Sequence, residues 1–146
     1  IPEPSKNDGK DVHERYLEIK KGNAVGIDGD KYYGYKENLL DEIKANFKSF
    51  GIDINKSNIN FIKGLYQNTL KINSNISFAH IDCDWYESVM ISLIEIVPKL
   101  SKGGIIILDD YYAWSGCKLA TDKYFQDIKK DFIFEKKHNK LNIIKI

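Results

Sequence analysis

The chain has 146 residues, with 22 basic and 21 acidic side chains, so its net charge is +1, and 42% of its residues are hydrophobic. This composition fits one globular domain over residues 1–146, and the charge balance argues against a dedicated nucleic-acid or membrane-surface protein. No run of 18 apolar residues is present, so we expect no membrane span. Cys83 and Cys117 have neither zinc-site spacing nor the look of a disulfide framework, which favours a reduced, cytoplasmic setting.

The first part of the chain predicts loops and two helices. Residues 1–10 hold two of the three prolines and read as loop, and residues 11–21 carry apolar side chains at helical spacing. Residues 36–50 predict a clear helix, whose apolar stripe we expect in the core and which stops at Gly51. Residues 22–35, rich in Gly, Asp and Tyr, form either an aromatic lid or a loop packed on its own tyrosines.

The middle of the chain predicts three strands. A short β-like run at 60–63 is the first, and the apolar runs 76–81 and 105–108 are the second and third. Residues 85–100 predict an amphipathic helix between the last two, followed by a turn at Gly103-Gly104. Four consecutive aliphatic residues at 105–108 are typical of a central parallel strand that is buried on both faces.

The end of the chain predicts a helix and a hairpin. Residues 115–130 form the helix, and the runs 132–135 and 141–146 flank a polar link that contains His138-Asn139. Two β-like runs around a short polar link are a hairpin signal. The order of elements therefore indicates an α/β fold that closes with an antiparallel pair.

Acidic residues follow both of the stronger strands, with Asp82 and Asp84 after the first and Asp109 and Asp110 after the second. Ligands of open α/β sheets bind outside the carboxyl ends of the strands, and hard oxygen ligands suit Mg²⁺. We therefore predict a Mg²⁺ site made by Asp82, Asp109 and Asp110, against the alternative that these acids are only turn residues. We expect Asp84 to cap the following helix and His80 to be a core side chain.

The motifs HIDCDWYES at 80–88 and LSKGGIIILDDYYAWSGCKLATDKYF at 100–125 resemble the macrocin O-methyltransferase family. The resemblance extends over about residues 1–128. It implies a Rossmann-like class I methyltransferase sheet with a C-terminal antiparallel hairpin. It also implies S-adenosylmethionine-dependent, Mg²⁺-assisted methyl transfer to a hydroxyl of a sugar or of a glycosylated small molecule.

The same resemblance assigns individual roles. It favours Asp82 as metal ligand, as a cofactor contact and as the catalytic base, and it places Gly64, after Lys63, near the adenosine end of the cofactor. Residues 1–4 match the segment that follows the second strand in that family. We therefore expect the chain to start after the first two strands, without the Gly-rich cofactor loop.

An alternative is a non-catalytic α/β fragment of a methyltransferase that acts as a binding or dimerisation module. The exposed sheet edge that such a fragment would have favours a homo-oligomer. A phosphate-handling Mg²⁺ enzyme is a weaker alternative, because no phosphate-binding loop is present.

Overall fold

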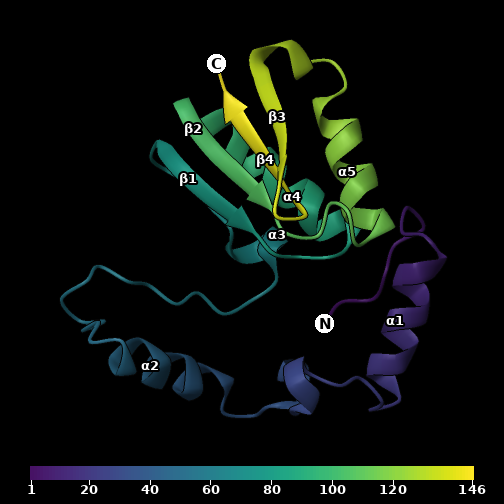
Figure 1. Ribbon diagram of the computed structural model, residues 1–146, viewed down its shortest axis with the longest axis vertical. Helices are drawn as coiled ribbons and strands as arrows, with labels where there is room; N and C mark the ends of the chain where they lie inside the picture. Colours follow the sequence, from purple (N-terminus) through teal and green to yellow (C-terminus); the bar gives the residue numbers. More distant parts are fainter. The chain divides into compact units, whose positions relative to one another are not determined.

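The structure, a computed structural model, describes residues 1–146 and divides into two compact units (Figure 1). The larger unit contains Pro2–Tyr16 and Gly64–Ile146, and the smaller contains Ile1 and Leu17–Lys63. That residues 1–146 form a single domain stays a prediction. None of the helices has both the length and the apolar character needed to cross a bilayer.

The larger unit is built on one four-stranded sheet in the order β1-β2-β4-β3 (Figure 1). Its strands are β1 Ile76–Ile81, β2 Leu100–Leu108, β3 Phe132–Lys137 and β4 Lys140–Lys145. β1 and β2 are parallel, whereas β4 is antiparallel to both β2 and β3. The predicted strand–helix–strand unit and the predicted hairpin are therefore confirmed, and the α/β class with them.

The hairpin turn explains why the last two strands pair as they do. His138 and Asn139 have positive φ angles of 47° and 62°, and Lys137 pairs with Lys140 across the turn. Two central residues with positive φ make a turn whose twist matches that of the flanking strands. The turn thereby fixes the register, and Phe134 pairs with Ile143.

Two helices, α4 Tyr86–Ile96 and α5 Ser115–Phe125, supply the apolar side chains that cover one face of the sheet. The buried sheet residues in this core are Ile81, Leu100, Ile106, Leu108, Phe132, Leu141 and Ile143. From α4 the core receives Val89 and Leu93, and from α5 it receives Ala120 and Phe125. Cys83 and Cys117 are both free thiols, and Cys117 is buried in this core.

Several expectations about these elements are wrong in detail. The run 60–63 is not a strand, and the Gly103-Gly104 pair lies inside β2, where the register to β1 shifts, rather than in a separate turn. In β2, Gly104, Ile106 and Leu108 are buried, but Ile105 and Ile107 on the other face are only partly buried. The expected burial of both faces requires a second covering layer, which the run of aliphatic residues cannot supply by itself.

The remaining helices of the chain are α1 Lys10–Lys20, α2 Leu39–Ser49 and the short α3 Tyr66–Thr69. α2 was expected to bury its apolar stripe, yet none of its residues is buried, and Phe50 just beyond it is 82% exposed. Phe47 makes an edge-to-face ring contact with Phe61. The periodicity correctly predicted a helix, but burial also depends on a partner surface that periodicity does not specify.

Residues 22–35 form a loop that packs on its own tyrosines. Tyr32 is buried and its ring lies 4.4 Å from that of Tyr33 and 5.2 Å from that of Tyr35, centroid to centroid. The Tyr35 hydroxyl donates to the carbonyl of Ile19 at 2.7 Å and accepts from the N–H of Ala24 at 3.2 Å. These contacts support the packed-loop alternative over the lid.

Candidate functional site

Three carboxylates meet at the carboxyl ends of β1 and β2. Asp82 and Asp84 follow β1, Asp110 follows β2, and one oxygen of each lies within 4.8 Å of the others. The parallel pairing of the strands brings these loops together, because the Asp109 N–H donates to the carbonyl of Ile81 at 3.0 Å. We call Asp82, Asp84 and Asp110 the acid cluster.

Within the acid cluster, Asp110 has the most unfavourable surroundings for a free carboxylate. Its Oδ2 atom is buried and has no hydrogen-bond partner. Burial, reinforced by the neighbouring charges of Asp84 and Asp82, raises the pKa of Asp110 to about 7. A buried anion with an open oxygen beside two other acids favours either a proton or a cation.

This arrangement predicts a pH dependence of stability in the ion-free protein. The pKa of Asp110 is raised from 3.8 to about 7, so this side chain binds its proton more tightly in the folded than in the unfolded state. Its contribution to stability is complete below pH 3.8 and is lost as the pH rises to about 7. We therefore expect urea unfolding in EDTA to give a free energy that declines over this range.

The Asp110→Asn variant isolates this contribution, because asparagine does not titrate. Its unfolding free energy, measured over the same pH series, should decline less steeply than that of the wild type. Parallel curves for the two proteins would contradict the raised pKa.

Asp84 does not cap the following helix, contrary to expectation. The N-cap residue of α4 is Trp85, which makes no side-chain cap hydrogen bond, and the first helical N–H, that of Tyr86, donates to Asp8 Oδ1 at 2.8 Å. Asp84 instead faces Asp82 and Asp110. Burial raises the pKa of Asp84, and Asp82 adds to this effect, whereas Asp110 and Arg15 oppose it.

The N-terminal segment of the larger unit binds the first turns of both core helices. Asp8 accepts from Tyr86 at the start of α4, and Asp11 accepts from the Ser115 N–H at 2.9 Å and from the Ser115 hydroxyl at the start of α5. Gly116 leaves room for this approach, because an added Cβ would collide with Asp8. The two helices begin directly after the two acidic loops, so Asp8 and Asp11 help to hold the acid cluster in place.

Asp109, a predicted metal ligand, has different neighbours in the structure. Its Oδ1 atom lies 2.9 Å from His80 Nε2 and forms an ion pair with Lys140 at the hairpin. His80 is therefore a half-exposed partner of Asp109, and the expectation of a core histidine is wrong. β1, which carries His80, is an edge strand of the described sheet, so no other strand pairs with its outer edge. A ligand role for Asp109 stays a prediction.

Gly64 lies in the turn before α3, and an added Cβ there would collide with the side chain of Thr69. This contact gives Gly64 a packing role in the turn. Its predicted place near the cofactor stays a prediction. Of the residues proposed from sequence, the structure thus brings Asp82 and Asp110 together, adds Asp84, and leaves Asp109 and Gly64 outside the acid cluster.

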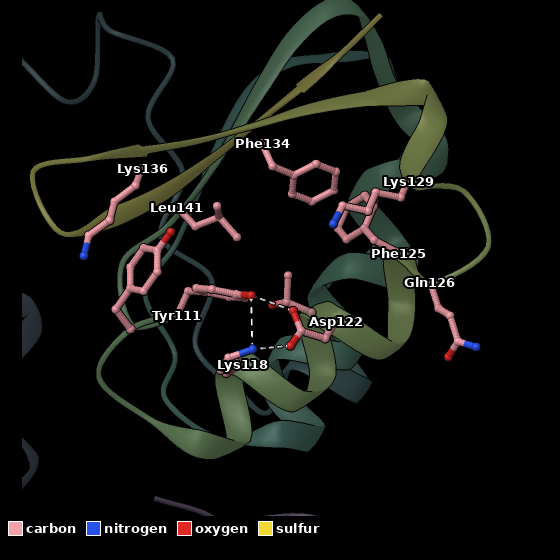
Figure 2. A pocket seen from close by; sticks show the side chains of 11 residues that line it. Tyr111, Lys118, Asp122, Phe125, Gln126, Lys129, Phe134, Lys136 and Leu141 are labelled. Carbon is pink, nitrogen blue, oxygen red and sulfur yellow. Dashed lines mark hydrogen bonds and ion pairs between the residues drawn. The ribbon is translucent and has the colours of Figure 1, made fainter.

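A cavity of about 590 Å³ lies between α5 and the β3–β4 hairpin (Figure 2). Tyr111 and Tyr112, which directly follow Asp110, form one wall, and α5 and the β3–β4 hairpin form the others. Both tyrosines therefore line the cavity.

Two solved O-methyltransferase structures superpose on this chain. The O-methyltransferase NovP superposes with a TM-score of 0.72 at 21% identity, covering 99% of this chain and 55% of that one. The apo structure of CalS11, a TDP-rhamnose 3'-O-methyltransferase, gives a TM-score of 0.62 at 16% identity and covers 77% of this chain and 54% of that one. The chain thus has the fold of these two structures, as the resemblance led us to expect.

The chain belongs to the macrocin-O-methyltransferase (TylF) family, whose model matches residues 23–134. Demethyldecarbamoylnovobiocin O-methyltransferase of Streptomyces niveus is 33% identical over 86 residues, which are 58% of this chain and 32% of that enzyme. The 8-demethyl-8-(2,3-dimethoxy-alpha-L-rhamnosyl)-tetracenomycin-C 4'-O-methyltransferase of Streptomyces olivaceus is 32% identical over 87 residues, with the same coverage. The chain spans about a third of the length of these curated relatives.

Proposed function

We propose that this chain is part of an S-adenosylmethionine-dependent O-methyltransferase that acts on a hydroxyl of a sugar or glycosylated small molecule. Membership of the macrocin-O-methyltransferase family carries the proposal. Its relatives support the sugar-type acceptor, because one acts on a rhamnosyl group and a structural neighbour acts on TDP-rhamnose. Cytoplasmic location and homo-oligomer formation stay predictions.

The acid cluster fits a divalent cation such as Mg²⁺. Three carboxylates supply hard oxygen ligands, and the buried, partnerless Oδ2 atom of Asp110 is an open coordination position. A divalent cation bound there would offset two of the three negative charges and lower the pKa of an acceptor hydroxyl. We propose Asp82 and Asp110 as ligands, with Asp84 as the third in the arrangement that the structure shows.

The three side chains of the acid cluster differ in exposure, and we assign their roles accordingly. Asp82 is the exposed member, whereas Asp84 and Asp110 are partly buried. Only an exposed carboxylate can reach the acceptor, so we assign to Asp82 the role of base that takes the hydroxyl proton. We assign to Asp84 and Asp110 the role of holding the cation. We place Gly64 and Asp82 near S-adenosylmethionine, whose methyl group must lie in line with the acceptor hydroxyl.

The test is a calorimetric titration of S-adenosylmethionine, followed by transfer of its labelled methyl group to a rhamnose-containing acceptor, with Mg²⁺ and then with EDTA. We expect binding, transfer with Mg²⁺, and loss of transfer with EDTA. Transfer that persists in EDTA would contradict the metal role. Absence of cofactor binding would favour the non-catalytic fragment.

A further inference from the structure

The cavity that Tyr111 and Tyr112 line has more lysines than acidic residues in its walls. Lys118, Lys129 and Lys136 line it, and Asp122 is its single acidic wall residue. Lys118 forms an ion pair with Asp122, whose Oδ1 also accepts from the Tyr111 hydroxyl at 2.6 Å (Figure 2). One of the three lysines is thereby compensated, and the cavity keeps an excess of two positive charges.

The other two lysines lie over aromatic rings and not beside acids. Lys136 Nζ is 4.4 Å from the centroid of the Tyr112 ring, and Lys129 Nζ is 5.5 Å from that of Phe134. A cation over a ring face is weakly stabilised by the ring, but its hydrogen-bond donors stay available. Each ammonium group can therefore still donate to an anion that enters the cavity.

The sheet register shows why Lys136, and not its neighbour Lys137, reaches the cavity. Lys136 pairs with Leu141, whose side chain is buried on the helix side of the sheet, whereas the neighbouring Lys137 alternates to the opposite face. Lys137 forms an ion pair with Glu135. Lysines on an edge strand discourage pairing with other chains, but that role does not require Lys136 to stand over a cavity ring.

The excess positive charge of the cavity favours an anionic ligand. Lysine ammonium groups bind phosphate groups as point charges. Lys129 and Lys136 lie at opposite ends of the cavity (Figure 2), and together their charges match that of a diphosphate. Tyr112 is 40% exposed and offers a ring surface to a base or sugar. An uncharged aromatic aglycone would leave both ammonium groups without an anion.

We propose that this cavity binds the nucleoside diphosphate portion of a nucleotide-linked sugar. Asp110 belongs to the acid cluster and the next two residues line the cavity, so one loop would contact both the reacting sugar and its diphosphate. The link to methylation rests on the proposed function. The binding of the diphosphate does not.

The test titrates uridine diphosphate, inorganic pyrophosphate and uridine into the purified protein in EDTA, without S-adenosylmethionine. We expect uridine diphosphate to bind more tightly than pyrophosphate, and uridine to give no measurable heat at the same concentrations. EDTA excludes a diphosphate–metal complex at the acid cluster. Added salt should weaken the binding, because exposed charges are screened.

The Lys129→Met, Lys136→Met double variant should raise the Kd for uridine diphosphate at least about tenfold, because both ammonium groups that would donate to the diphosphate are removed. The matched control, Lys130→Met with Lys137→Met, removes two neighbouring charges that do not line the cavity and should leave the Kd unchanged. All four side chains are exposed, so both variants should keep the wild-type thermal unfolding temperature.

Three results would overturn the proposal: no binding of uridine diphosphate at millimolar concentration, equal weakening in both double variants, or equal affinities for pyrophosphate and uridine diphosphate. None of them bears on methyl transfer, because neither cofactor nor metal is present in this titration. Conversely, a failure of methyl transfer with intact diphosphate binding would contradict the proposed function alone.

Discussion

Replacing Asp110 with asparagine is expected to lower kcat/KM for methyl transfer by at least about 100-fold. Loss of a side chain that merely supports a metal ligand already costs roughly 10–100-fold, and Asp110 is proposed as a ligand itself. Asparagine keeps the shape but removes the charge, and its amide nitrogen cannot coordinate a cation. The residual activity should no longer respond to Mg²⁺ or to EDTA.

The same variant can be tested without the reaction. Calorimetric titration of Mg²⁺ into the wild-type chain should give binding that Asp110→Asn abolishes. Asp127→Asn removes an exposed acid from the turn after α5 and is the matched control. Wild-type affinity for Mg²⁺ in Asp110→Asn would contradict the assignment.

Two further variants decide the third ligand. The structure places Asp84 with Asp82 and Asp110, whereas the sequence predicted Asp109, which His80 and Lys140 engage. We expect Asp84→Asn to weaken Mg²⁺ binding more than Asp109→Asn. The opposite order would restore the ligand set predicted from sequence.

Replacing Asp8 with alanine is expected to destabilise the protein by about 2–3 kcal/mol. Asp8 is only 8% exposed, and it accepts from the Tyr86 N–H at 2.8 Å, the Ser5 N–H at 2.8 Å and the Ser5 hydroxyl at 3.0 Å. Alanine would leave the N–H at the start of α4 without a partner in a region that water reaches poorly. Urea unfolding measures the difference in free energy.

Asp8→Asn keeps one oxygen acceptor in the same place and should cost less than Asp8→Ala. Glu3→Ala, an exposed substitution in the same segment, should change the unfolding free energy by less than about 0.5 kcal/mol. If Asp8→Ala unfolds within that margin of the wild type, Asp8 does not hold the start of α4.

The sequence by itself determined the order of the elements around the site. Alternating apolar residues at 76–81, a continuous aliphatic run at 105–108 and a polar link at His138-Asn139 predicted the strands and the hairpin that the structure contains. These signals are local, because each depends on the periodicity of one segment or on the conformations that turn residues allow. The positions of the four acids at the ends of these two strands followed from the same local signals.

Only the tertiary structure decided which of those acids meet. Strand alternation ceases where a strand ends, so the direction of Asp84 and Asp109 depends on how the loops turn and on what lies opposite. Lys140, brought back by the hairpin, engages Asp109 and leaves Asp84 to face Asp110.

The sequence also did not predict that the N-terminal segment binds the first residues of α4 and α5. Trp85 and Trp114 occupy the N-cap positions of α4 and α5, and a tryptophan side chain cannot accept a backbone hydrogen bond. The two tryptophans indicate that the acceptors for the first N–H groups of α4 and α5 lie in another part of the chain. They do not indicate which part. Asp8 lies 78 residues from Tyr86 along the chain, and the fold alone brings the two together, because a hydrogen bond depends on distance in space.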